Sequence, residues 1–171
     1  MMQIINKEAS MYLISIYDET SFKPGEAEVI LFSLLSERKP YQSISHKQMP
    51  TYEAHKHFVR SRPYTCWFFI KQSEIQDVLG SVYLTHENEI GIFIFEDCTH
   101  KGYGKKAIDM LMMSCSRDKL FYANIAPTNS ASIAFFVNLG FTHYKTMAGA
   151  EGVIQYTYKK VNPYYALPQD V

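Results

Sequence analysis

Cysteine is scarce in this 171-residue chain, which has only Cys66, Cys98 and Cys115. Their number is odd, they lie far apart, and no Cys-x-x-Cys pair or neighbouring histidine has the spacing of metal ligands. The sequence therefore supports neither a disulfide framework nor a zinc site. We expect no metal cofactor.

The chain also has no excess of charge of either sign. Seventeen lysines and arginines balance seventeen aspartates and glutamates, so the formal net charge is zero. Proteins that bind nucleic acid or an anionic membrane surface usually carry a basic excess. We therefore expect a small-molecule partner, and neither nucleic acid nor a membrane.

Long hydrophobic runs are also absent. No stretch reaches the roughly 18 consecutive apolar residues that span a bilayer, and residues 1–10 have no basic segment followed by an apolar run. These absences favour a cytoplasmic protein. A hydrophobic content of 47% is enough for a substantial core, and the length predicts one domain over residues 1–171.

The apolar pattern predicts a mixture of strands and helices. Short apolar, β-branched runs predict strands at residues 11–17, 67–71, 80–85, 89–95, 120–125, 141–146 and 153–161. Helical spacing predicts helices at residues 25–38, 52–61 and 127–139, and a further one with its apolar stripe at 107–115. The strands between 67 and 95 are joined only by polar turns, which favours an antiparallel meander.

A glycine-rich loop, Gly102-Tyr103-Gly104, lies between the strand at 89–95 and the next helix. Main-chain N–H groups in the first turn of a helix have no intrahelical acceptor, so a loop of this kind can bind phosphate. A tight turn that merely needs glycine is the alternative interpretation.

The same loop, extended to Ala107, fits the G-x-G-x-x-G/A spacing of a dinucleotide-binding fingerprint. That fold needs a parallel sheet and an acidic residue at the end of the next strand to bind the ribose. Here the next strand ends at residues 122–125 without an acid, and the preceding strands follow one another as hairpins. The context therefore argues against a nicotinamide or flavin enzyme.

Two motifs give residues 13–160 a resemblance to the GNAT superfamily of acetyltransferases. The segment from Thr99 to Gly104 is similar to the family signature of Arg or Gln, two residues, Gly, any residue, and Gly or Ala, with Thr99 in the place of Arg or Gln. Downstream, Asn129 and Ser132 lie in the predicted helix at 127–139, which residues 138–141, Asn-Leu-Gly-Phe, close. The resemblance implies an α+β fold, with a central mixed, mostly antiparallel sheet of about seven strands flanked by about four helices.

The resemblance also implies the activity, an N-acetyltransferase that moves the acetyl group of acetyl-coenzyme A to a primary amine by direct attack in a ternary complex. Main-chain groups of the strand, the loop, and side chains of the last helix would bind the coenzyme. The implied residues are Phe93, Ile94, Phe95, Thr99, His100, Lys101, Gly102, Tyr103, Gly104, Lys105, Asn129, Ser132, Phe135 and Phe136.

Three residues are candidates for proton transfer. Glu89 stands where some relatives carry the base that removes the amine proton through water, although a solvated turn acid is the alternative. His46 lies where this fold shapes the acceptor pocket, and an imidazole can take a proton near neutral pH. Phe136 replaces the tyrosine that protonates the thiolate in many relatives, so Tyr103, or else Tyr122 or Tyr144, is the candidate acid.

The acceptor is less defined. The segment 44–52 resembles a stretch of bacterial acetyltransferases associated with surface-sugar biosynthesis, which suggests the amino group of a nucleotide-linked sugar. A protein N-terminus, a polyamine or an aminoglycoside are alternatives. So are a catalytically silent acyl-coenzyme A-binding or regulatory module, and an unrelated structural protein. The apolar C-terminal strands and Tyr164-Tyr165 suggest a homodimer.

Overall fold

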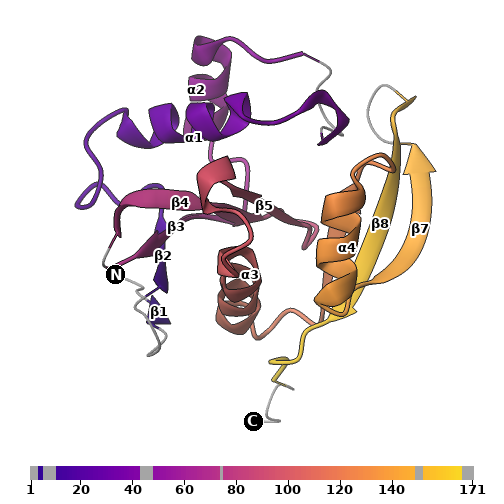
Figure 1. Ribbon diagram of the computed structural model, residues 1–171. Coiled ribbons are helices and arrows are strands. Elements are labelled where there is room, and N and C mark those ends of the chain that lie inside the picture. The colour runs from indigo at the N-terminus through magenta and orange to yellow at the C-terminus, as the bar shows by residue number, and fades with distance from the viewer. Residues whose placement is uncertain (1–3, 6–10, 43–47, 74, 149–151, 167–171) are drawn as a thin grey trace.

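The computed structural model describes residues 4–5, 11–42, 48–73, 75–148 and 152–166. His46 lies outside the described residues. The structure has two sheets, one between helices in the centre of the molecule and one at its side (Figure 1).

The first sheet is an antiparallel meander in strand order β1-β2-β3-β4-β5, which confirms the prediction for residues 67–95. Its strands are β1 (Ile4–Ile5), β2 (Met11–Ser15), β3 (Cys66–Gln72), β4 (Ile75–Leu84) and β5 (Ile90–Ile94). β4 begins five residues before the predicted strand. The connection to β3 is a tight turn in which Gln72 pairs with Ile75, and main-chain pairing continues through polar residues such as the exposed Asp77.

The second sheet has the antiparallel order β6-β8-β7, built from β6 (Leu120–Ile125), β7 (Thr142–Ala148) and β8 (Ile154–Val161). A single parallel bridge, Glu89 to Tyr122, joins it to the first sheet next to β5. The amide of Tyr122 donates to the carbonyl oxygen of Asn88 at the same point (2.9 Å). Beyond this bridge no ladder joins β5 to β6 within the described ranges, so one edge of β5 is open.

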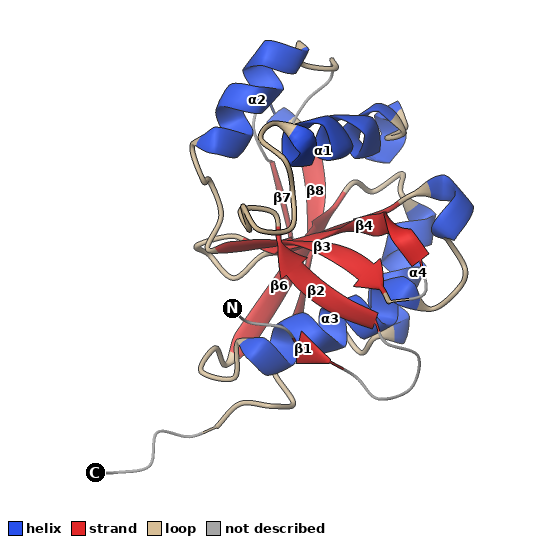
Figure 2. Ribbon diagram, turned by 90° about the vertical axis from the view of Figure 1, so that its left-hand side faces the viewer, coloured by secondary structure: helices blue, strands red, loops and turns tan. Residues whose placement is uncertain are grey.

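Helices cover both faces of the first sheet (Figure 2). α1 (Glu26–Ser36) and α2 (Tyr52–Arg60) lie on one face, where Leu31, Val59 and Phe69 share a core cluster. α3 (Tyr103–Ser114) packs on the other face in the larger cluster. Two short 3₁₀ helices, η1 (Pro40–Gln42) and η2 (Glu96–Cys98), follow α1 and β5. In the described part of the chain, no helix is long and apolar enough to cross a membrane.

α4 (Ser130–Asn138) lies beside the second sheet (Figure 1). It begins three residues later than predicted, because the side chain of Asn129 caps it: Oδ1 accepts a hydrogen bond from the amide of Ser132 (3.2 Å). The helix ends before Gly140, whose φ of 85° is left-handed as expected for a terminating glycine. The seven longer strands and four α-helices confirm the α+β class.

Candidate active site

A cleft of about 930 Å³ opens where β5 and β6 part. One half is bounded by the loop before α3 and by the first turns of α4, and we call it the coenzyme half. The other half is bounded by the C-terminal end of α1, η1 and the end of β4, and we call it the acceptor half. β5 runs along both halves, which places a ligand in contact with its open edge.

The loop before α3, which we call the cradle, lies at the cleft and contains the N-terminus of a helix. His100 and Gly102 have left-handed φ values of 60° and 81°, and Gly102 is the N-cap of α3. The amides of residues 102–105 have no hydrogen-bond acceptor among the described residues, and the first intrahelical bond runs from Lys106 to the carbonyl of Gly102 (3.3 Å). Gly102, Gly104 and Lys105 all line the cleft. Free amides, the helix dipole and a lysine together suit a pyrophosphate.

Gly104 also permits close packing. A Cβ at this position would lie 3.1 Å from the ring Cζ of Phe135 and 3.7 Å from Cδ1 of Ile92. A larger residue would therefore require the Phe135 ring to shift by a few tenths of an ångström. The two glycines serve different needs, backbone conformation at 102 and close approach at 104, while both leave the amides exposed to a ligand.

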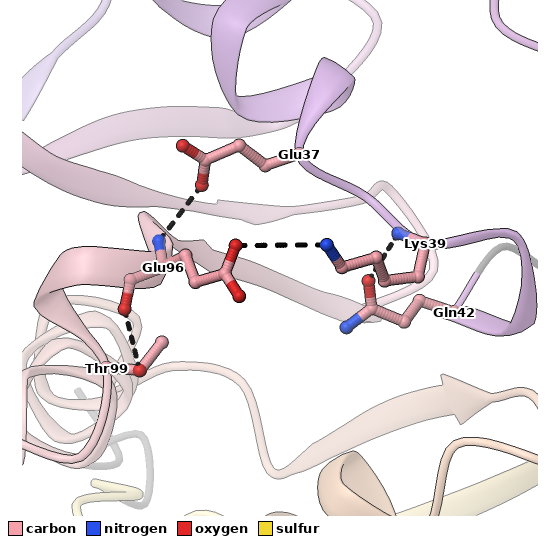
Figure 3. Close-up of polar contacts among 5 residues, drawn as sticks. All are labelled: Glu37, Lys39, Gln42, Glu96 and Thr99. Carbon is pink, nitrogen blue, oxygen red and sulfur yellow. Dashed lines mark hydrogen bonds and ion pairs between the residues drawn. The ribbon is translucent and has the colours of Figure 1, made fainter.

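Two loop side chains hold the loop in place. The hydroxyl of Thr99 donates to the carbonyl of Glu96 (2.8 Å, Figure 3), and Nζ of Lys101 donates to the carbonyl of Asp97 (2.8 Å). Thr99 lines the cleft and Lys101 does not. The loop conformation is thus fixed through η2, without the arginine or glutamine that the family usually has at position 99.

The open edge of β5 corrects one sequence prediction. The amide of Phe95 donates to the carbonyl of Leu79 in β4 (3.0 Å), so Phe95 cannot be a free main-chain donor. Main-chain groups alternate between the two sides of an antiparallel strand, so the amide of Phe93 also faces β4. The amides of Ile92 and Ile94 face the opening. Ile94 stays a predicted donor, and Ile92 has a second outward-facing amide, which the sequence analysis missed.

The predicted residues of α4 lie at the cleft. Asn129, Ser132, Phe135 and Phe136 all line it. Asn129 is buried, and its side-chain oxygen is already engaged in the helix cap. Phe136 is buried too, with its ring 5.1 Å from that of Phe141 in an edge-to-face contact. It packs as a core residue and has no hydroxyl to offer.

Glu89 lies at the floor of the cleft in a chain of hydrogen bonds. Its carboxylate accepts from Nδ2 of Asn124, and Oδ1 of Asn124 accepts from the hydroxyl of the buried Thr157 (2.6 Å). The amide of Glu89 donates to the hydroxyl of Thr85 (3.1 Å). Glu89 is therefore a positioned carboxylate rather than a solvated turn acid. Asn124 was missed, and its only sequence signal is a polar residue inside an apolar strand.

Two stacked tyrosines line the acceptor half. The rings of Tyr64 and Tyr83 lie 4.0 Å apart and nearly parallel at 4°. Tyr83 lies directly over Gly91, because a Cβ on Gly91 would overlap its ring and hydroxyl. Burial raises the pKa of the Tyr64 hydroxyl, and Tyr83 adds to the rise. At neutral pH this hydroxyl is therefore protonated and able to donate a hydrogen bond.

The segment 37–42 crosses the acceptor half and is anchored on both sides. Glu37 Oε2 accepts from the amide of Glu96 (2.9 Å), and Nζ of Lys39 lies 3.8 Å from Oε2 of Glu96 (Figure 3). On the far side the hydroxyl of Thr128 donates to the carbonyl of Tyr41 (3.2 Å). Arg38, between these anchors, lines the cleft. No local motif marks this residue, so the sequence analysis missed it.

The sequence model of the acetyltransferase (GNAT) family matches residues 30–141, well over half of the chain. The chain belongs to this family. The matched region includes the C-terminal part of α1 together with β5, the cradle loop and α4, so it contributes to both halves of the cleft. Membership makes the protein an acetyltransferase that uses acetyl-coenzyme A and acts on an amine, as the two motifs implied.

Solved structures share the fold of this acetyltransferase over nearly its whole length. An acetyltransferase from Salmonella typhimurium that modifies the N-terminal serine of ribosomal protein L7/L12 is 20% identical, with a TM-score of 0.67 and coverage of 92% of this chain and 98% of its own. A domain from Methanocaldococcus jannaschii is 22% identical, with a TM-score of 0.70 and coverage of 90% and 99%.

A spermidine N-acetyltransferase from Vibrio cholerae, in complex with coenzyme A and spermine, is 12% identical, with a TM-score of 0.67 and coverage of 94% and 99%. At these identities the likeness shows the fold alone. No curated protein matches the sequence. Within the described ranges no group of three or more His, Cys, Asp or Glu side chains could hold a metal ion.

Proposed function

We propose that this acetyltransferase moves the acetyl group of acetyl-coenzyme A to a primary amine of a small acceptor, by direct attack within a ternary complex. The observation that carries the proposal is that a main-chain anion cradle and a positioned carboxylate, Glu89, share one cleft. The first candidate for the acceptor is the amino group of a nucleotide-linked sugar, although residues 44–47 of the segment that suggested it lie outside the described residues.

The coenzyme is proposed to bind along β5. Amides of residues 102–105 would hold the pyrophosphate together with Lys105, and the outward amides of Ile92 and Ile94 would pair with the pantetheine arm and the thioester oxygen. Apart from the Lys105 ammonium, these donors are amides fixed by main-chain geometry. They suit a co-substrate that must be held in one orientation while the acceptor varies.

Glu89 is proposed as the base. It would take a proton from the acceptor amine, directly or through water, as the nitrogen attacks the thioester carbon; the C–N bond forms and the C–S bond breaks. The departing sulfur then needs a proton. Of the three tyrosines considered from the sequence, Tyr103 lines the cleft, whereas Tyr122 and Tyr144 are not among its lining residues. Tyr103 is therefore the proposed donor, and His46 stays a prediction.

The test is coenzyme A release with a panel of primary amines. Glu89→Gln should lower kcat by about 100-fold or more, the usual contribution of a general base, with the Kd of acetyl-coenzyme A unchanged. Glu87→Gln, which removes an exposed carboxylate two residues away in the same hairpin, is the matched control and should keep full activity. Coenzyme binding without release for any amine would instead favour the silent binding module.

A protein or peptide N-terminus is a second candidate acceptor. It is supported by the fold shared with the Salmonella enzyme that modifies a ribosomal protein. Peptides with free N-termini therefore belong in the panel, and a kcat/KM for peptides well above that for amino sugars would select this candidate. Cytoplasmic location and a homodimer stay predictions.

A further inference from the structure

The charges of the acceptor half are few and specific. Among the described residues that line the cleft, Glu89 is the only carboxylate, and Arg38 and Lys105 are the only lysine or arginine side chains. Lys105 belongs to the coenzyme loop. The acceptor half therefore offers one negative group and one positive group, which is a poor match for an acceptor with several positive charges.

Arg38 is held in the cleft by an aromatic ring. Its guanidinium carbon lies 5.4 Å from the ring centre of Phe93 in β5, and the side chain is half-buried. Phe93 packs with the α1 and α2 cluster, whereas Ile92 and Ile94 pack with the α3 cluster. Arg38 thus lies on the face of β5 opposite the one covered by α3, whose first turn forms the coenzyme cradle.

Two acids close to this segment are already engaged, Glu37, which is next to Arg38 in the sequence, and Glu96. Glu37 accepts from the amide of Glu96, and the carboxylate of Glu96 pairs with Lys39 (Figure 3). Arg38 itself makes no ion pair or side-chain hydrogen bond with any described residue. A half-buried guanidinium with its donors free is suited to an oxyanion, which it can bind through two parallel hydrogen bonds.

We propose that Arg38 binds an oxyanion of the acceptor, so that the enzyme selects amines that also carry a phosphate or carboxylate. The inference rests on the proposed function, since it assigns one end of the same acceptor site. Glu89, the residue before β5, and Phe93 in β5 are four residues apart in an extended segment, so their Cα atoms are separated by about 13 Å. The amine would be bound towards Glu89 and the oxyanion towards Arg38.

Matched pairs of amines that differ in one anionic group test the proposal. Glucosamine phosphate against glucosamine tests a phosphate, and β-alanine against its amide tests a carboxylate. For at least one pair the wild-type enzyme should show a kcat/KM about tenfold or more higher for the anionic member, the usual gain from a charge-assisted hydrogen bond. Arg38→Gln should remove this preference by lowering kcat/KM for the anionic member more than for the uncharged member.

Lys39→Gln is the control, because it removes the same charge from the next residue, whose ammonium is exposed and paired with Glu96. It should keep the preference. A wild-type enzyme without any preference, or an Arg38→Gln variant that retains it, would overturn the inference and leave the proposed function standing. A rise in the Kd of acetyl-coenzyme A in Arg38→Gln would also overturn it, because Arg38 would then serve the coenzyme.

Binding separates the two proposals. Calorimetry of the same pairs with protein saturated with coenzyme A needs no turnover. If the anionic member binds more tightly to the wild type than to Arg38→Gln, the oxyanion site at Arg38 is supported. If the wild type also releases no coenzyme A from acetyl-coenzyme A, the proposed enzyme mechanism is contradicted. Equal binding to both proteins would contradict the subsite whatever the turnover.

Discussion

The two halves of the cleft are built differently. In the coenzyme half the main chain makes the proposed contacts, through the first-turn amides of α3 and the outward amides of Ile92 and Ile94. In the acceptor half side chains make them, chiefly Arg38, Tyr83 and Glu89. Main-chain donors are fixed by the fold and lose no rotamer freedom on binding. The coenzyme half therefore tolerates substitutions such as threonine at position 99.

The halves also differ in how far apart their parts lie in the sequence. The cradle comes from one local segment, residues 98–105, followed by the start of α4. The acceptor half combines the end of α1, β4, β5 and Asn124 of β6. A substitution in the coenzyme half should therefore change only the binding of the coenzyme. A substitution in the acceptor half should change only the binding of the acceptor. The following predictions test this division.

The largest effect is expected for Gly104→Asp. The new carboxylate would project beside the proposed pyrophosphate, and two unit charges about 4 Å apart near a protein surface repel by about 4 kcal/mol. Acetyl-coenzyme A should then bind more than about 100-fold more weakly. Calorimetry or thermal stabilisation by the coenzyme measures the loss.

Gly104→Asn separates charge from size. Its Cβ makes the same close contact, 3.1 Å from the ring of Phe135, but it carries no charge. This variant should lose much less affinity for acetyl-coenzyme A than Gly104→Asp does. Equal losses of affinity in the two variants would mean that packing alone explains the effect and that no phosphate binds beside residue 104.

Sequence reasoning reached furthest where the site is local. Glycine spacing, the position after a strand and the Asn129 motif pointed to a loop and a helix that both line the cleft, because the required backbone conformation restricts a few adjacent residues. Their binding of the coenzyme stays a prediction. It failed where the fold brings distant residues together, as with Arg38 and Tyr83. It also failed for Phe95, because the sequence does not say which amides of a strand face its neighbour.

Gly91→Ala should affect the acceptor half. The added methyl group would overlap the ring of Tyr83, so the tyrosine must move and its stacking with Tyr64 is lost. Overpacking of this kind typically destabilises a protein by about 1–3 kcal/mol, which thermal or urea denaturation would detect. We also expect a KM for the acceptor raised by about tenfold, with the Kd of acetyl-coenzyme A within about threefold of wild type.

A double-mutant cycle attributes that effect to the ring. In a Tyr83→Ala background the alanine at 91 has no ring to displace, so its additional effect on stability should nearly vanish. If Gly91→Ala lowers stability as much in the Tyr83→Ala background as in the wild type, the backbone of β5 and not the Tyr83 ring is the cause. A loss of coenzyme affinity as large as the loss for the acceptor would break the division between the two halves.

The smallest effect is expected for Thr99→Ala. The hydroxyl donates to the carbonyl of Glu96 (2.8 Å) at an exposed position, so its removal should cost at most about 1 kcal/mol of stability. If the cradle consists of main-chain amides, the Kd of acetyl-coenzyme A should change by less than about threefold. A loss of tenfold or more would show that this side chain contacts the coenzyme, and that the coenzyme half depends on side chains as the acceptor half does.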